Sequence, residues 1–179
     1  MRADLTAVMM MAAAGLAGCS TISDVPDVRV GQATLSFANG LPAGTAQLYR
    51  DGVGLRVAVA ATGMIPGAHG YHLHTTGTCQ GPDFTSAGGH LNPGGRKHGS
   101  LAAGGAHLGD LPNLIIAANG SGASTEAIPG NRDAALADIF DGDGTAVIIH
   151  ADPDDYRTDP TGNAGSRVAC GVLTRTVSR

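Results

Sequence analysis

The chain has 179 residues, which suits one domain with a sizeable core better than two. Its formal net charge of −4, with scattered basic residues and Lys97 as the only lysine, excludes the basic surface expected of a nucleic-acid-binding protein. With 28 glycines, 9 prolines and no tryptophan, it is expected to be rich in turns and to build its core from Val, Ile, Leu and Ala.

The N-terminus has the pattern of a bacterial export signal. The first two residues carry positive charge, and the apolar stretch 5–16 is too short to cross a bilayer but suits the core of a signal peptide. The Leu-Ala-Gly-Cys sequence ending at Cys19 resembles the bacterial lipobox, in which the cysteine is lipid-modified and becomes the first mature residue. The alternatives are an ordinary cleaved signal peptide and a buried apolar helix.

We therefore divide the chain into a signal peptide (1–18), a lipidated tether (19–27) and one domain (28–179). A lipid on Cys19 would anchor the protein to a membrane of the bacterial cell envelope, facing the periplasm, with the choice of membrane left open. Lipidation would leave Cys79 and Cys170 as a pair, which in an exported protein predicts a disulfide. Closing a loop of roughly ninety residues would stabilise the fold by ~4–5 kcal/mol.

Eight segments of the domain have the pattern of short β-strands. Segment 53–62 alternates apolar with small or charged residues from Val53 onward, and Asp51-Gly52 in front of it predicts a two-residue hairpin turn. The turn sequence 119–122 predicts a second hairpin. The eight predicted strands are 28–37, 46–50, 53–62, 71–75, 114–118, 123–127, 145–150 and 167–174. Because the only helical candidate is a short turn at 134–140, the predicted fold class is all-β.

Two segments, 76–113 and 151–166, have no strand pattern. Loops of that length are uncommon in compact domains unless they are functional. The first carries four of the seven candidate metal ligands, and the second begins directly after the last histidine. We predict that these two loops build the functional site.

Three histidines lie on predicted strands. His72 and His74 are two residues apart, so their side chains point to the same face of one strand, and His150 ends another. Three neutral imidazoles are a plausible set of ligands for Cu(II). A lone histidine is more often solvated or hydrogen-bonded, but this pair leads into a glycine-rich loop with three more histidines. That pattern favours a metal site.

The first long loop holds a second candidate set of ligands. His98, His107 and Asp110 add two imidazoles and a carboxylate, and His90 would complete a closed set of three nitrogens and one oxygen. Such a set suits tetrahedral zinc in a structural role. Spacing alone leaves open whether His90 serves copper, zinc or both.

With these motifs in order, the chain resembles the Cu,Zn superoxide dismutase family over residues 28–175. The resemblance is carried by Gly67-Ala68-His69-Gly70-Tyr71-His72-Leu73-His74, Ala87-Gly88-Gly89-His90-Leu91-Asn92-Pro93, Lys97-His98-Gly99, His107-Leu108-Gly109-Asp110-Leu111-Pro112-Asn113, Val147-Ile148-Ile149-His150, Asp154-Asp155 and Gly162-Asn163-Ala164-Gly165-Ser166-Arg167-Val168-Ala169-Cys170-Gly171.

The resemblance implies an eight-stranded Greek-key β-sandwich or barrel that binds one copper and one zinc per subunit. It implies copper ligands at His72, His74, His90 and His150, and zinc ligands at His90, His98, His107 and Asp110. His90 would then bridge the two metals as an imidazolate. His69 matches a structural histidine of the family that binds no metal.

The resemblance gives roles to three further features. Asp154 matches a carboxylate that hydrogen-bonds one histidine ligand of each metal, here His72 and His98. Arg167 matches the arginine that draws the anionic substrate towards copper. The pair Cys79–Cys170 matches the intrachain disulfide of the family.

The implied activity is the dismutation of superoxide to oxygen and hydrogen peroxide. Arg167 and His90 would be the catalytic residues, His90 by accepting and returning a proton. Segment 152–159 holds four acids against one arginine, so we expect the electrostatic guidance of superoxide to be weaker or relocated. The alternatives are a copper-storing or copper-delivering lipoprotein with little turnover and a structural zinc protein with a vestigial copper site. The sequence is compatible with both a monomer and a homodimer.

Overall fold

The computed structural model of the chain describes residues 28–176, and residues 1–27 and 177–179 are not described. The predicted signal peptide, the tether and the lipidation site at Cys19 therefore lie outside the described residues. Within the described range, no helix is both long and apolar enough to cross a membrane.

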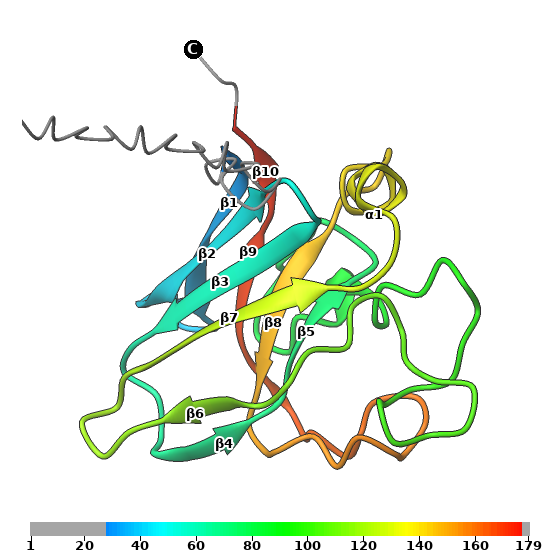
Figure 1. Cartoon of the computed structure of the whole chain (residues 1–179). Helices are drawn as coiled ribbons and strands as arrows, with labels where there is room; N and C mark the ends of the chain where they lie inside the picture. Colours follow the sequence, from blue (N-terminus) through cyan, green and yellow to red (C-terminus); the bar gives the residue numbers. More distant parts are fainter. Residues whose placement is uncertain (1–27, 177–179) are drawn as a thin grey trace, which may run out of the picture.

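One antiparallel sheet dominates the structure and curls into an open half-barrel (Figure 1). Its strands lie in the order β5-β8-β9-β1-β2-β3-β7, and β10 also pairs with β1. The members are β1 (Val28–Phe37), β2 (Pro42–Arg50), β3 (Leu55–Ala61), β5 (Tyr71–His74), β7 (Gly122–Ile128), β8 (Ala146–His150), β9 (Arg167–Val172) and β10 (Thr174–Arg175). A second, two-stranded sheet joins β4 (Gly67–His69) to β6 (Leu114–Ile116). The placement of β7 beside β3 and of β9 beside β1 needs the long return connections of a Greek key. The predicted all-β class is confirmed.

Alternating burial along the strands explains why the sheet has an apolar inner face. In β3, Leu55, Val57 and Val59 are buried, and Val57 pairs with the buried Leu48 of β2. Burying one such side chain contributes about 1.5–3 kcal/mol, so these rows supply much of the driving force for folding. The same core takes in Leu35, Leu73, Leu114, Ile139 and Ile149.

The first hairpin turn is longer than predicted. Arg50 pairs with Leu55, so residues 51–54 connect the strands rather than 51–52 alone. The Asp51 carboxylate accepts hydrogen bonds from the backbone N–H groups of Val53 and Gly54, both at 2.7 Å. This side-chain cap satisfies the turn and keeps Val53 out of the strand. Val53, predicted to begin the strand, is instead 82% exposed.

The second predicted hairpin is wrong in its pairing. The turn is present, closed by a 2.9 Å bond from the Ala117 N–H to the Ser121 carbonyl. However, β6 pairs with β4, and β7 pairs with β3. The turn therefore connects two sheets, because strand partners are chosen by the whole fold and not by proximity along the chain.

Two short elements differ from the sequence expectations. β4 was not predicted, since three residues are too few to display a period. The candidate helical turn is an eight-residue helix, α1 (Arg132–Ile139). Asn131 caps it, because its side-chain oxygen accepts the N–H groups of Asp133 and Ala134 at 3.0 and 3.1 Å.

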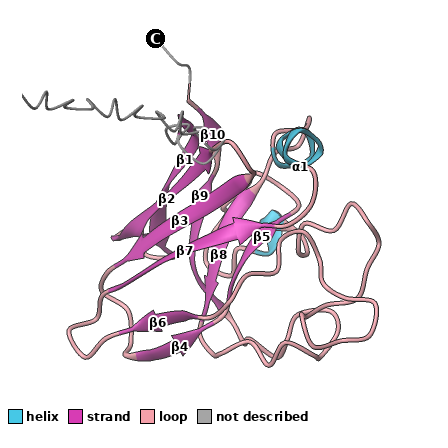
Figure 2. Cartoon of the chain, viewed as in Figure 1, coloured by secondary structure: helices cyan, strands magenta, loops and turns pink. Residues whose placement is uncertain are grey.

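The two long loops lie where the sequence predicts them and meet beside β5 and β8. Figure 2 shows both as irregular chain, apart from the short 3-10 helix η2 (Thr85–Ala87) in the first loop. The Leu101 N–H donates to the Tyr156 carbonyl, which joins the two loops at 3.1 Å. The predicted disulfide is confirmed: Cys79 in the first loop is bonded to Cys170 on β9, with Cα atoms 5.7 Å apart.

Candidate metal centre

Two neighbouring strands hold the first histidines. His72 and His74 lie on β5, which pairs with β8, and His150 is the last residue of β8. The His150 N–H donates to the Gly70 carbonyl at 2.8 Å, which fixes the end of β8 against the start of β5. All three imidazoles are buried. The sheet therefore brings together side chains that are more than seventy residues apart.

A first group of four imidazoles forms where these strands meet the first long loop. It consists of His72, His74, His90 and His150, whose ligand atoms lie within 4.8 Å of one another. Among residues 28–176, five buried side-chain atoms lack a hydrogen-bond partner, and four of them are one ring nitrogen from each member of this group. These atoms are Nδ1 of His72 and Nε2 of the other three.

The other ring nitrogen of each member is held by the protein. His72 Nε2 lies 2.7 Å from an Asp154 oxygen, and His74 Nδ1 lies 3.0 Å from the Gly88 carbonyl. His150 Nδ1 lies 3.2 Å from the Gly165 carbonyl. One nitrogen of each ring is thus fixed and the other left free, which is the arrangement that metal-binding histidines adopt.

A second group surrounds a single carboxylate oxygen, Oδ1 of Asp110. The Nδ1 atoms of His90, His98 and His107 lie 2.9, 3.1 and 3.2 Å from it. The other oxygen of Asp110 accepts the backbone N–H groups of Gly99 and His107 at 2.8 and 2.9 Å. Three nitrogens and one oxygen converging at this spacing fit a tetrahedral zinc ion.

His90 belongs to both groups. Its Nδ1 faces the Asp110 carboxylate, and its Nε2 is one of the four unpaired nitrogens of the first group. The ring centroid of His90 lies 4.0 Å from that of His72. One imidazole therefore stands between the two sets of ligands, with one nitrogen available to each.

Asp154 also links the two groups. Its Oδ2 lies 2.7 Å from His72 Nε2, and its Oδ1 lies 2.9 Å from His98 Nε2. The carboxylate is buried. His69, in contrast, belongs to neither group, and its two ring nitrogens each lie 2.8 Å from a backbone carbonyl, those of His150 and Ile65.

Burial keeps the ligands in the protonation states that bind metals. Desolvation lowers the pKa of His74 to about 2, of His150 to about 3 and of His90 to about 4, and neighbouring histidines add to the effect. Burial alone would raise the pKa of Asp110, but hydrogen bonds from His90 and from two backbone N–H groups hold it well below its usual value. These pKa values keep His74, His90 and His150 neutral and Asp110 ionised near neutral pH, as metal binding requires.

Arg167 lies beside the first group. Its guanidinium donates to the Phe84 carbonyl at 2.7 Å and to the Gly88 carbonyl at 2.6 Å. The Gly88 carbonyl also faces His74, so one backbone oxygen ties the arginine to the group. After burial and a neighbouring histidine, the positive charge of Arg167 makes a smaller contribution to the lowered pKa of His74 and of His150. A small anion near these histidines would therefore meet a positive field.

The acidic segment 152–159 is bonded more to the protein than its composition suggests. Asp154 faces two histidines, and Asp159 accepts the His98 backbone N–H at 2.8 Å. Asp155 accepts three hydrogen bonds from Arg157 and Thr158, and its pKa is lowered to about 2 by those bonds, that from the Thr158 hydroxyl first. These acids organise the loop, although of the four only Asp154 is buried, and Asp152, Asp155 and Asp159 remain exposed.

Three residues near the centre had no role assigned from the sequence: Gly88, Asn113 and Asp159. Gly88 supplies its carbonyl to Arg167 and His74, and Asn113 pairs with the backbone of Asp154. Each residue contacts a partner that is distant along the chain. Gly88 lies 14 positions from His74 and 79 from Arg167, Asn113 lies 41 from Asp154, and Asp159 lies 61 from His98. The sequence carries no local signal for such contacts.

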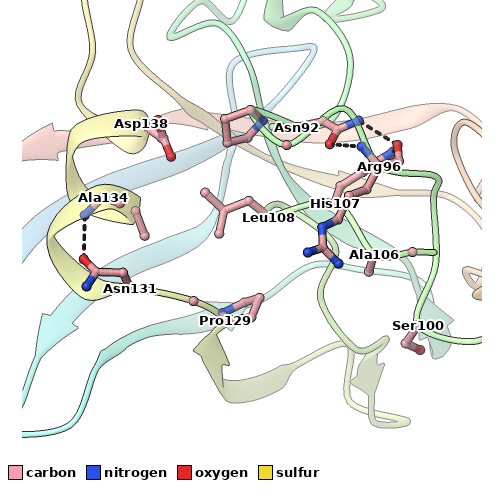
Figure 3. A pocket seen from close by; sticks show the side chains of 15 residues that line it. Asn92, Arg96, Ser100, Ala106, His107, Leu108, Pro129, Asn131, Ala134 and Asp138 are labelled. Carbon is pink, nitrogen blue, oxygen red and sulfur yellow. Dashed lines mark hydrogen bonds between the residues drawn. The ribbon is translucent and has the colours of Figure 1, made fainter.

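A pocket of about 560 Å³ lies between the first long loop and α1, and His107 of the second group lines it (Figure 3). Arg96 stands beside His107, Leu108 forms the middle, and Asn131 and Asp138 lie on the opposite wall. His107 Nε2 lies 3.1 Å from the Arg96 carbonyl. Of the second group, His107 is the member that borders this pocket.

Comparison with known proteins gives a consistent answer. The family described as copper/zinc superoxide dismutase (SODC) matches residues 42–173. The chain is 39% identical over 148 residues to "Superoxide dismutase [Cu-Zn] 2" of Aquifex aeolicus, covering 79% of this chain and 84% of that protein. It is 37% identical over 190 residues to "Superoxide dismutase-like protein YojM" of Bacillus subtilis, covering 94% and 95%. The crystal structure of a SOD-like protein from Bacillus subtilis superimposes with a TM-score of 0.76 at 37% identity, covering 82% of this chain and 100% of that one.

Proposed function

The chain belongs to the copper/zinc superoxide dismutase family, and on that premise we propose how its own side chains serve the reaction. It is a superoxide dismutase, an oxidoreductase whose cofactors are copper and zinc. The reaction converts two superoxide anions and two protons into one oxygen and one hydrogen peroxide. When bound, copper supplies the one-electron chemistry, and zinc supplies a fixed positive charge beside it.

We assign copper to the first group, His72, His74, His90 and His150. The observation that carries this assignment is the set of four buried ring nitrogens, one from each residue, that have no protein partner within residues 28–176. Leaving buried polar atoms unpaired costs free energy unless a ligand takes them up. Imidazole nitrogens are ligands that suit copper.

We assign zinc to the second group, His90, His98, His107 and Asp110. The three Nδ1 atoms around one ionised carboxylate oxygen support this assignment, because zinc in closed structural sites takes four such ligands. Asp154 would orient one ligand of each metal, since its two oxygens face His72 and His98.

The same geometry supports His90 as the bridge between the metals. An imidazole that has lost its proton can offer Nδ1 to one ion and Nε2 to the other, and the two nitrogens of His90 face different groups. We assign to His90 the delivery of one of the two protons that the reaction consumes. Nε2 would take this proton from solvent only while it is not serving as a metal ligand, and would then pass it to the reduced substrate. That nitrogen is the atom of the ring that faces the copper group.

Arg167 would attract the substrate. Its guanidinium stays charged, and two backbone carbonyls hold it where its field acts on His74 and His150. Superoxide approaching the copper group would therefore move down a favourable potential.

The proposed function and the bridge can be tested in one reconstitution. Protein loaded with Cu²⁺ and Zn²⁺ should bind one of each and remove superoxide far faster than the metal-free protein. Replacing zinc by paramagnetic Co²⁺ should weaken the electron paramagnetic resonance signal of Cu²⁺, because a shared imidazolate couples the two ions. The zinc-loaded protein, with a diamagnetic second ion, is the matched control.

Two outcomes would contradict the proposal separately. A full, uncoupled Cu²⁺ signal beside bound Co²⁺ would remove His90 from the bridge. Copper bound without accelerated superoxide decay would favour the copper-storing alternative over the enzyme.

We also propose that Cys19 carries a lipid that anchors the protein in the bacterial cell envelope, facing the periplasm. The motif that motivates this proposal ends at Cys19, outside the described residues. Growth with a radioactive fatty acid should label the wild-type protein, and Cys19→Ala should remove the label. Equal labelling of the variant would rule out Cys19 as the attachment site.

A further inference from the structure

We propose that Asn113 is a positioning residue of the metal centre, which acts by holding the backbone of Asp154. The inference rests on the assignment of the two metal groups given above. The hydrogen bonds of Asn113 go to Asp154 and Tyr156 and not to a residue of either group. Asn113 would therefore influence metal binding only through Asp154, whose carboxylate contacts both His72 and His98.

The contact between the two residues is a reciprocal pair of hydrogen bonds. The Asn113 side-chain oxygen accepts the Asp154 N–H at 2.8 Å, and its Nδ2 donates to the Asp154 carbonyl at 2.9 Å. One amide side chain therefore satisfies both backbone groups of Asp154, as a partner strand would do in a sheet. Asp154 lies in a long loop without strand pairing, so Asn113 substitutes for the missing strand.

The backbone of Asp154 matters because its side chain is short. The two carboxylate oxygens must reach His72 at 2.7 Å and His98 at 2.9 Å at the same time. An aspartate has only two side-chain torsions, so a shift of its backbone moves both contacts. The Tyr156 N–H also donates to the carboxylate, at 2.6 Å, which leaves little freedom to compensate.

Asn113 is itself fixed to the zinc side of the centre. It follows Asp110 by three residues, and its backbone N–H donates to the Tyr156 hydroxyl at 2.8 Å. Asn113 thus connects the segment that carries a zinc ligand to the loop that carries Asp154. Through this connection, occupation of the second group would help to fix His72 in the first.

The test uses Asn113→Ala, Asp154→Ala, the double variant and a matched control, Asn119→Ala. The Asn119 side chain also accepts a backbone N–H, that of Ser121, together with the Ser121 hydroxyl, but it serves an exposed turn and contacts neither Asp154 nor a residue of the two groups through these bonds. The full-length protein is loaded with copper and with Co²⁺ in the second group. The readouts are the visible spectrum of Co²⁺ and the rate at which a chelator removes it.

Losing a direct outer partner of a metal ligand, here Asp154, costs about 10–100-fold. Asn113→Ala weakens the contacts of that partner without removing it, so we expect it to speed Co²⁺ release by up to about 10-fold and by less than Asp154→Ala. Its Co²⁺ spectrum should shift in the same direction as that of Asp154→Ala, while Asn119→Ala matches the wild type. The double variant should release Co²⁺ no faster than Asp154→Ala alone, because both changes remove the same contact. Asn113→Asp keeps the acceptor for the Asp154 N–H but sets a carboxylate oxygen against the Asp154 carbonyl, so it should release Co²⁺ at least as fast as Asn113→Ala.

Additive rates in the double variant, or an Asn113→Ala protein indistinguishable from wild type, would overturn the proposal. Should Asn113→Ala fail to fold, the Asn113→Asp variant decides the question by the same readouts. Failure of the wild-type protein to take up Co²⁺ would overturn the assignment of the second group, and this proposal with it. Uptake by wild type with no effect at Asn113 would overturn the positioning role alone.

Discussion

Replacement of His150 by alanine should abolish superoxide dismutation while leaving zinc and the fold in place. His150 provides one of the four unpaired ring nitrogens of the copper group and takes no part in the zinc group. Losing an outer partner of a metal ligand costs about 10–100-fold, so losing a ligand itself should lower the rate by more than about 100-fold. The residue ends β8, and its backbone bond to Gly70 does not depend on the side chain.

The measurement is superoxide decay followed by stopped flow, together with the copper and zinc content of each protein. His107→Ala is the informative comparison, because it removes a ligand from the zinc group only and should lower zinc content first. Dismutation by His150→Ala at the wild-type rate would show that catalysis does not occur at this group. A slow wild type that the substitution does not change further would favour copper storage.

Removal of the disulfide should produce the largest change in stability. Cys79 and Cys170 are 91 residues apart, and closing a loop of that length is worth ~4–5 kcal/mol in the chain-entropy account. The bond also joins the first long loop to β9, where Cys170 packs in a small buried cluster with Phe84 and Ile148. The same loop supplies the carbonyls that hold Arg167, so its release should also loosen the substrate-attracting charge.

The double variant Cys79→Ser/Cys170→Ser should therefore unfold at markedly lower denaturant concentration than the wild type. Metal-free proteins should be compared, since bound metal stabilises the folded state by mass action and would mask the difference. Cys19→Ser, which leaves the disulfide intact, is the control and should unfold like the wild type. A difference below about 1 kcal/mol would mean that the disulfide contributes little beyond the packing around it.

The sequence was sufficient for much of the fold and for the choice of residues. Alternating apolar residues placed most of the strands, because burial on one face of a sheet imposes a period of two. The strand prediction failed where another interaction decided the local structure. Val53 has the right hydrophobicity for a strand, yet the Asp51 carboxylate draws it into a turn. The strands around the turn at 119–122 are paired elsewhere, because each finds a better partner in a distant segment.

The sequence by itself determined which groups are present: six histidines and one aspartate with the chemistry of metal ligands, an arginine and a pair of cysteines. Only the tertiary structure decided which nitrogen of each ring is free, that the nitrogens of His90 face two different groups, and that Asn113 holds Asp154 across 41 positions of chain. The physical reason is that side-chain chemistry and strand period are local properties of the chain. Contacts between loops depend on which strands pair, and that choice is made by the packing of the whole domain.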